Sequence, residues 1–168
     1  MIKKFLLAIC VAIPAALCAQ TAKFGTVDVE AIIPNMPEYT QANTQLQEAT
    51  NKYQVEYKTL QDEMNKKMAE FQQLSNDPNT PQSIKERRVQ EIQEMDERAK
   101  QFMATAQQDL ERQNAQLMQP IQEKMVNAIK QVGAENGFTM IFPVGASIYD
   151  SPDVVDITPM VKTKLGIQ

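Results

Sequence analysis

The stretch "LSNDPNTPQS" (residues 74–83) is the strongest interruption in a long run of helical sequence pattern. Asp77 and Pro78 form a turn signal, because Asp bonds to nearby backbone and Pro fixes its own φ. Thr80 followed by Pro81 suits a helix N-cap and first helical residue, and Ser83 with Glu86 offers a capping box one step later. The stretch therefore predicts a hairpin of two helices with its tip at residues 75–82.

The two helices of this hairpin are expected over residues 37–74 and 81–136. In the first, apolar residues recur in eight steps over 28 residues, a spacing of 3.5 that is the coiled-coil period. We call this line of residues the seam. Its members are Leu46, Ala49, Tyr53, Tyr57, Leu60, Met64, Met68, Phe71 and Leu74, and in the second helix Ile84, Ile92, Met95, Ala99, Phe102, Ala106, Leu110, Leu117, Ile121, Met125, Ala128 and Val132.

Three positions in the second helix depart from the apolar pattern. Gln113 or Asn114 leaves one layer polar. Pro120 is expected to bend the helix and to lie opposite Tyr39, near the start of the first helix. Asn136 with Gly137 predicts the C-terminal stop.

The segments outside the hairpin have a different character. "AKFGTVDVEAII" (residues 22–33) predicts a short strand, and "FTMIFPVGASIYD" predicts two strands in a hairpin over residues 138–142 and 146–149. Residues 159–165 are expected to form a short final helix. The predicted fold is mainly α with a small β body: a long antiparallel helical hairpin, or coiled-coil tentacle, projects about 60 Å, at roughly 1.5 Å per residue, from a β-stranded oligomerisation body. The domain from residue 20 to 168 would place the body at 20–36 and 137–168, and the arm at 37–136.

The first nineteen residues have the pattern of a signal peptide, with Lys3 and Lys4 before an apolar run and cleavage expected after Ala19. The run is too short for a comfortable membrane span, and Leu17 before Cys18 does not suit a lipidation signal. Cys10 and Cys18 both lie in this segment, so the mature chain has no cysteine. We expect a soluble, exported periplasmic protein without disulfides.

Charge and composition narrow the function. Lys3 and Lys4 account for two of the 17 Lys and Arg residues, so in the mature chain 15 basic residues stand against 21 acidic ones, a net charge near −6. Nucleic acid is therefore not an expected partner. The sequence has no His, and it contains no Gly-rich loop or nucleophile motif, so we predict no enzymatic activity and no cofactor.

Acidic residues give two further candidates for chemistry. Asp150, Asp153 and Asp156 contain oxygen ligands that suit Ca²⁺, but they lack the Gly and terminal Glu of a calcium loop. Turn formation and helix capping are the preferred interpretation, and no metal site is predicted. The carboxylates at residues 86–97 alternate with Arg and Lys, as on a solvated helix face.

Apolar residues in the outer parts of the two helices have two interpretations. Seam residues pack helix against helix, whereas flexible Met also suits surfaces that bind many apolar partners. The sequence between Met64 and Arg88 has five basic and three acidic residues. This local net charge of +2 would favour acidic clients or membrane headgroups, and chance is the alternative explanation. The candidate binding residues are Met64, Met68, Phe71, Leu74, Ile84, Met95, Phe102 and Met103.

The predicted body is small and has no disulfide, and its strand edges would be open in a monomer, so oligomerisation is expected. The subunit number does not follow from these features. "KFGTVDVEAII", the long polar hairpin and "NGFTMIFPVGASIYDSPDVVDIT" together resemble the Skp (OmpH-like) family of periplasmic chaperones. The most specific part is the closing stretch with Tyr149, a turn, and the helix start Asp156–Thr158.

The resemblance implies a homotrimer whose strands form a central body and whose three hairpins enclose a cavity. Unfolded outer-membrane β-barrel proteins would be held there without ATP and passed to the barrel-assembly machinery. The residues that the resemblance assigns to the oligomerisation body are Phe24, Val27, Val29, Phe138, Met140, Phe142, Ile148 and Tyr149. The best-known members are basic and this chain is acidic, so apolar contact and confinement would replace electrostatic capture of clients or lipopolysaccharide.

An exported coiled-coil spacer or adaptor with one defined partner is the alternative function. Such hairpins usually sit on large barrel domains, and the flanks of this hairpin are short. Prefoldin shares the plan of a hairpin on a β body, but it is cytosolic, and this chain begins with an export signal.

Overall fold

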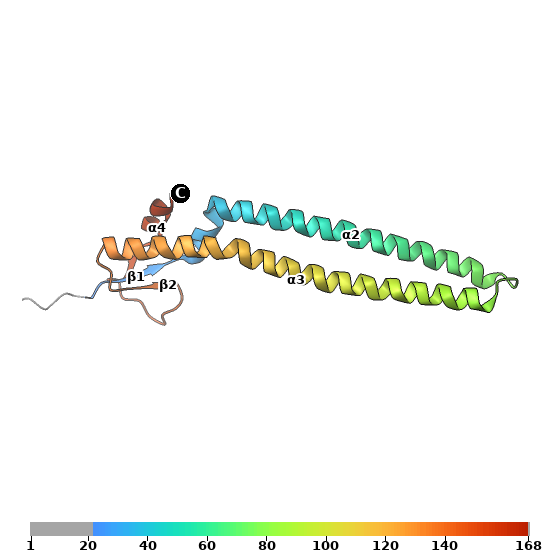
Figure 1. The fold of residues 1–168 in the computed structure, drawn as a ribbon. Helices are drawn as coiled ribbons and strands as arrows, with labels where there is room; N and C mark the ends of the chain where they lie inside the picture. Colours follow the sequence, from blue (N-terminus) through green and yellow to red (C-terminus); the bar gives the residue numbers. More distant parts are fainter. Residues whose placement is uncertain (1–21, 168) are drawn as a thin grey trace, which may run out of the picture. The chain divides into compact units, whose positions relative to one another are not determined.

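The computed structural model describes residues 22–167 of the chain, so the predicted signal peptide and its cleavage site lie outside the described residues. The described residues form two compact units. The first, the body, contains residues 22–32 and 125–167, and the second, the arm, contains residues 33–124. The confirmed fold class is mainly helical, with two long helices and a small β-sheet (Figure 1).

The body is built on a three-stranded parallel sheet. β1 (Phe24–Val27) lies in the centre, with β2 (Met140–Pro143) on one side and β3 (Val155–Asp156) on the other. Phe24 is in register with Met140, and Gly25 with Val155. The Val144 amide donates to the Val27 carbonyl at 2.9 Å, and the Ile157 amide donates to the Thr26 carbonyl at 2.9 Å, which extends both ladders by one bond.

The predicted hairpin in the closing stretch is wrong. Residues 146–149 form no strand, and the second strand after the arm is β3, which pairs with β1 instead of β2. The physical reason is burial: β3 leads into Ile157, which is 0% exposed, whereas Ile148 in the predicted strand is fully exposed. The second edge of β1 therefore receives the segment that brings an apolar side chain into the core.

Helices cover the core of the body. α1 (Val29–Ile32), which the sequence pattern assigned to a strand, packs with α4 (Thr158–Leu165), the predicted final helix. Asp28 begins α1, because its Oδ1 accepts from the Ala31 amide at 2.9 Å, and its own amide donates to Thr158 Oγ1 at 2.9 Å. The buried core side chains are Val27, Ile32, Met125, Ala128, Val132, Ile157 and Val161.

α3 (Gln82–Glu135) contributes its last residues to the body and ends as predicted. Gly137 has φ +67°, the Phe138 amide donates to the Gly133 carbonyl at 3.0 Å, and the Gly137 amide donates to Ala134 at 3.4 Å. This pair of bonds is the Schellman motif, in which a left-handed residue satisfies the last helical carbonyls. The backbone geometry thus favours glycine at residue 137.

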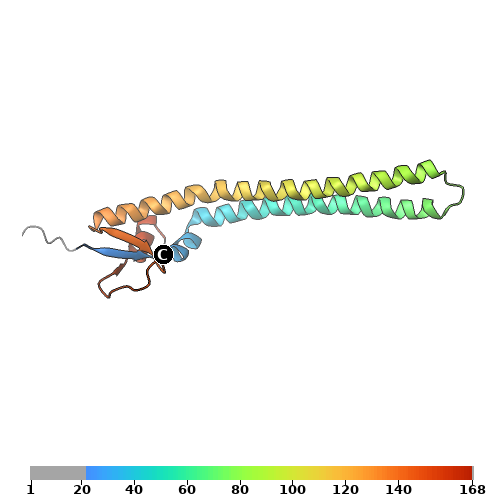
Figure 2. The ribbon, with the colours of Figure 1, turned by 90° about the horizontal axis from the view of Figure 1, so that it is seen from below.

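The arm consists of α2 (Pro37–Asn76), the facing part of α3, and the short 3₁₀ helix η3 (Ile33–Asn35) before them. The two long helices lie side by side and antiparallel (Figures 1 and 2). Contacts join Glu38 to Lys124, and Tyr53 to Asp109. As the residue number rises along α2 it falls along α3, which is the register of the predicted hairpin.

The tip of the arm follows the predicted turn chemistry. The Asn79 amide donates to Asp77 Oδ1 at 2.9 Å, and the Thr80 amide donates to the Asp77 carbonyl at 3.2 Å. The Pro81 carbonyl accepts from the Ile84 and Lys85 amides, so α3 begins one residue later than predicted, with Pro81 at the N-cap.

Pro120 lies where the sequence predicted it, opposite the start of α2. Pro120 and Lys124 line one groove with Glu38 and Ala42, so Pro120 does lie opposite the first turns of α2. Lys124 also pairs with Glu38, and this contact lowers the pKa of the Glu38 carboxyl.

Candidate functional site

The predicted client-binding residues lie on the facing helices of the arm, and they differ in exposure. Met68 is 43% exposed, Met103 48% and Ile84 37%, so these three present apolar surface to solvent. The other five, which are half-buried, are Met64, Phe71, Leu74, Met95 and Phe102. Most of the predicted set therefore packs between the helices and only part of it is open.

The seam of α2 runs through Lys67, which the sequence analysis left out. The half-buried residues Leu60, Met64, Lys67, Phe71 and Leu74 alternate in steps of four and three, the regular heptad pattern. Assigning Met68 to the seam was therefore wrong, because the heptad places Lys67 there.

The seam of α3 shows the same correction near the tip. Lys85 and Arg88 are half-buried at steps of three and four before Ile92, whereas Ile84 is exposed. A simple search for apolar residues chose Ile84 because it ignores long cationic side chains, which can bury their aliphatic stems while keeping the charge in water.

A groove about 390 Å³ in volume lies in the middle of the arm. Its larger apolar side chains are Tyr53, Tyr57, Met103 and Leu110. Tyr53 also packs edge to face against Phe102, with ring centroids 6.0 Å apart. The groove thus joins the exposed Met103 to the half-buried aromatic residues, and it offers an apolar surface between two helices.

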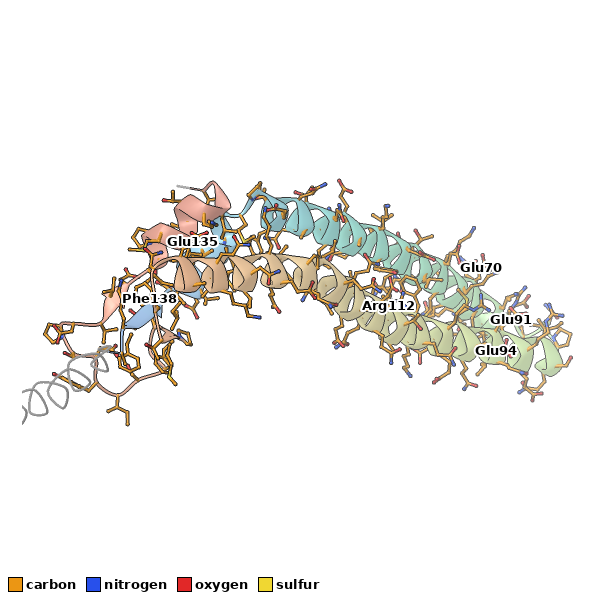
Figure 3. The ribbon with its side chains drawn as sticks, turned by 60° about the vertical axis from the view of Figure 1, so that its left-hand side comes forward. Glu70, Glu91, Glu94, Arg112, Glu135 and Phe138 are labelled. Carbon is orange, nitrogen blue, oxygen red and sulfur yellow. The ribbon has the colours of Figure 1, made fainter. Side chains whose placement is uncertain are left out.

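A polar layer crosses the arm beside this groove. The Tyr53 hydroxyl on α2 donates to Asp109 Oδ2 on α3 at 2.5 Å, and Gln113 Nε2 donates to the same oxygen at 2.5 Å. Arg112, labelled in Figure 3, pairs with the other carboxylate oxygen. The predicted polar layer at Gln113 is confirmed, and its centre is Asp109.

The hydrogen bonds in this layer shift the pKa values of Asp109 and Tyr53 in opposite directions. The Tyr53 hydroxyl, followed by the Gln113 amide, lowers the pKa of Asp109 because each donates to the carboxylate. The same bond to Asp109 raises the pKa of Tyr53, because it requires the neutral hydroxyl as donor. The layer therefore favours an ionised Asp109 and a neutral Tyr53.

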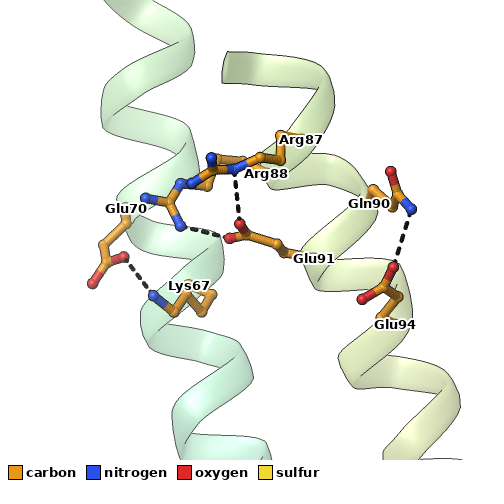
Figure 4. A network of polar contacts seen from close by, with 7 residues as sticks. All are labelled: Lys67, Glu70, Arg87, Arg88, Gln90, Glu91 and Glu94. Carbon is orange, nitrogen blue, oxygen red and sulfur yellow. Dashed lines mark hydrogen bonds and ion pairs between the residues drawn. The ribbon is translucent and has the colours of Figure 1, made fainter. Parts of the chain in front are cut away.

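Ion pairs surround the seam near the tip (Figure 4). Arg88 Nη1 lies 2.5 Å from Glu91 Oε2, Arg87 Nε lies 3.2 Å from Glu91 Oε1, and Lys67 lies 3.4 Å from Glu70. The bond from Arg88 is the main cause of a lowered pKa for Glu91. Each pair lies within a single helix: Lys67 and Glu70 are on α2, and the two pairs of Glu91 are on α3.

The residues predicted for the oligomerisation body divide between core and surface. Val27 is 3% exposed and belongs to the body's own core, and Val29 and Phe138 are half-buried. Lys23 Nζ lies 4.2 Å from the centre of the Phe138 ring, which Figure 3 labels. The exposed members, with their exposed fractions, are Phe24 39%, Met140 55%, Phe142 41%, Ile148 107% and Tyr149 79%.

Sequence reasoning missed five exposed apolar residues, two of which are Val126 in α3, 40% exposed, and Met160 in α4, 39% exposed. Val55 is 68% exposed and Val89 38% on the arm, and Val144 is 60% exposed in the body. Val55 and Val89 lie off the seam, so a list of apolar residues outside the heptad would have found them. Val144 directly follows β2, and the incorrect prediction placed it in the turn between two strands.

The acidic cluster of the closing stretch supplies turns and caps. Asp156 Oδ1 accepts from the Thr158 amide at 2.9 Å at the start of α4, and Asp153 contacts the Ser151 hydroxyl at 3.4 Å. Among residues 22–167, no group of three or more His, Cys, Asp or Glu side chains is placed to hold a metal ion.

A family model described as outer membrane protein (OmpH-like) matches residues 23–165. The chain belongs to this OmpH-like family. The family is one of periplasmic chaperones of outer-membrane proteins and is not known for enzymatic activity. The resemblance inferred from the closing stretch is thus confirmed, and the match includes both the body and the arm of this OmpH-like chain.

The comparison with curated proteins found no match to this OmpH-like chain. In the part of the chain that the structure describes, no helix is long and apolar enough to cross a membrane.

Proposed function

We propose that this OmpH-like protein is an ATP-independent periplasmic holdase that keeps unfolded outer-membrane β-barrel proteins from aggregating before membrane insertion. The observation that carries the proposal is the family match over residues 23–165, which includes both long helices and all three strands. The protein would be exported by residues 1–19 and would act in the periplasm as a soluble chain.

The arm would supply the binding surface. Met68, Met103 and Ile84 are exposed, and the groove beside Met103 is lined by aromatic and aliphatic side chains. Unbranched, polarizable Met adapts to partners of different shape, which is what a client without fixed structure requires. With a mature net charge near −6, derived above from the sequence, apolar contact and confinement would carry the binding.

The body would form a homotrimer, so that three arms enclose one client. β2 and β3 each leave one edge without a partner strand in the described chain, and exposed apolar residues such as Met140, Ile148 and Tyr149 lie on or after β2. Open edges beside exposed apolar side chains favour association. The subunit number rests on the family resemblance, as does delivery to the barrel-assembly machinery, whereas contact with lipid headgroups rests on the local charge of +2 between Met64 and Arg88.

The absence of Trp from the sequence makes a direct test available. A Trp-containing outer-membrane barrel protein, unfolded in urea, is diluted into buffer with or without residues 20–168 and without nucleotide. We expect a blue shift of the client fluorescence and suppressed light scattering. Unchanged fluorescence and full aggregation, with the chaperone still folded, would reject the holdase and favour the spacer, which predicts one defined partner.

The predicted trimer needs its own measurement. Sedimentation equilibrium of residues 20–168 should give three times the protomer mass, and Ile148→Asp should lower it while circular dichroism stays unchanged. Ser147→Asp is the matched control because Ser147 is a polar neighbour in the same loop. A wild-type monomer at micromolar concentration would contradict the trimer.

A further inference from the structure

The outer arm, which we define as residues 60–95, has cations at three seam positions. Lys67 on α2 and Lys85 and Arg88 on α3 occupy heptad positions that are normally apolar. The Arg88 side chain is 28% exposed, whereas that of its neighbour Arg87 is 64% exposed. Arg88 reaches from α3 across to α2 (Figure 4), and its Nε is buried without a hydrogen-bond partner.

Packing of α2 against α3 in the outer arm buries little apolar surface and therefore contributes little stability. No residue from 43 to 98 is fully buried, whereas Ala99, Ala106 and Ile121 further along α3 are. Burial of apolar surface is the main force that holds two helices together, so this part of the hairpin has the weakest closure. An unpaired buried Nε weakens it further.

The ion pairs of Lys67 and Arg88 in the outer arm do not depend on the packing of α2 against α3. Glu70 pairs with Lys67 three residues away on α2, and Glu91 pairs with Arg88 three residues away on α3. Since each pair lies within one helix, it survives when the helices separate, and Arg88 Nε gains water. The bond from Lys85 to the Ser75 carbonyl does join the two helices, but it lies at the tip.

From these observations we infer that α2 and α3 separate along the outer arm, and that the uncovered seam binds apolar segments of the unfolded client. This inference rests on the proposed function. The apolar residues that opening uncovers are Met64, Phe71, Leu74, Ile92 and Met95. Lys67 and Arg88 lie in the same stripe and extend their charges into water, so the uncovered surface contains both apolar and cationic side chains. Strands of outer-membrane barrels likewise carry both apolar and polar side chains.

Two double variants with identical composition and net charge test the inference. Lys67→Leu with Arg88→Leu places apolar residues at the seam. Lys66→Leu with Arg87→Leu makes the same changes one position away, where both side chains are exposed. Circular dichroism first confirms that each variant is folded. Amide hydrogen exchange of residues 60–95 is then measured without client, and the affinity for the urea-unfolded barrel protein is measured by its Trp fluorescence.

We expect the seam variant to slow exchange in the outer arm by about tenfold or more, because opening becomes rarer. It should also weaken client binding by about tenfold, since the client competes with a more stable closed seam. The off-seam variant should match the wild type in both measurements. Equal exchange in the two variants, or slowed exchange with undiminished binding, overturns the inference. If the wild type binds no client, the proposed function and the client role of the seam both fail, while exchange alone still decides whether the outer arm opens.

Discussion

The body and the arm are stabilised in different ways. In the body, Ile32, Ile157 and Val161 are 0% exposed, and the body consists of a small sheet, α1, α4 and the end of α3. In the arm, the outer half of the hairpin contains no fully buried residue among those described. The difference teaches that one chain can combine a rigid core of few residues with a long surface whose side chains are only half removed from water.

The largest effect is expected in the body. Ile157→Ala should lower the free energy of unfolding by about 2–5 kcal/mol, because it leaves a cavity where no solvent reaches. Met160→Ala, three residues later in α4 and 39% exposed, should cost far less. Urea unfolding, monitored by hydrogen exchange of the β1 amides, measures the loss of stability in both variants. Similar losses for the two variants would contradict the assignment of the core.

The same kind of truncation in the arm should have a smaller effect. Phe71→Ala removes a half-buried ring from the seam, and we expect a loss of about 1 kcal/mol, below the 1.5–3 kcal/mol of a fully buried side chain. Urea unfolding followed by circular dichroism, which reports mainly on the long helices, is the measurement. A loss as large as that of Ile157→Ala would remove the contrast between the two units.

Gly137 tests the end of the long helix. A Cβ at this position meets no atom within 4 Å, so Gly137→Ala should lower the free energy of unfolding only through its positive φ, by about 1–2 kcal/mol. Gly137→Asn should be milder, because Asn tolerates the left-handed conformation. Urea midpoints of the two variants decide the matter, and equal midpoints would exclude backbone strain as the cause.

The smallest effect is expected at the polar layer of the arm and depends on pH. The pKa of Asp109 is lowered by folding, so its contribution is present above the unfolded value of about 3.9 and is lost as pH falls through the lower folded value. The pKa of Tyr53 is raised, so its contribution is lost only as pH rises through that higher value. Melting temperatures of wild type and Tyr53→Phe should therefore converge in acid, and a constant gap down to pH 2 would contradict this linkage.

The regular features of the fold were predictable from the sequence. The 3.5-residue period, the turn chemistry of Asp77 and the stop at Gly137 are local, and each was confirmed within a residue or two. The strand at Val155 was not predicted, because nothing local favours it over residues 146–149. Only the burial of Ile157 against the rest of the body decides between them.

The candidate site was predicted in part, for a related reason. The pattern of apolar residues in the sequence identifies a stripe of the helix. It does not show that Lys67 takes the place of Met68 at the seam, because the exposure of each side chain depends on the position of the facing helix. A strict heptad count through Leu60 and Phe71 would have found Lys67. Of the exposed residues of the body, Phe24, Met140 and Phe142 lie on strands, whereas Ile148 and Tyr149 lie in a loop that the sequence pattern assigned to a strand.

The order of strands in the body has a consequence for how the chain matures. β1 is the first strand of the chain, yet both of its partners follow the entire arm: Phe24 pairs with Met140, and Gly25 with Val155. A chain that emerges from its N-terminus can form its helices from near neighbours, whereas the sheet must wait until the last segment is present. The central strand of this OmpH-like chain is therefore the first to leave the ribosome and among the last to acquire its neighbours.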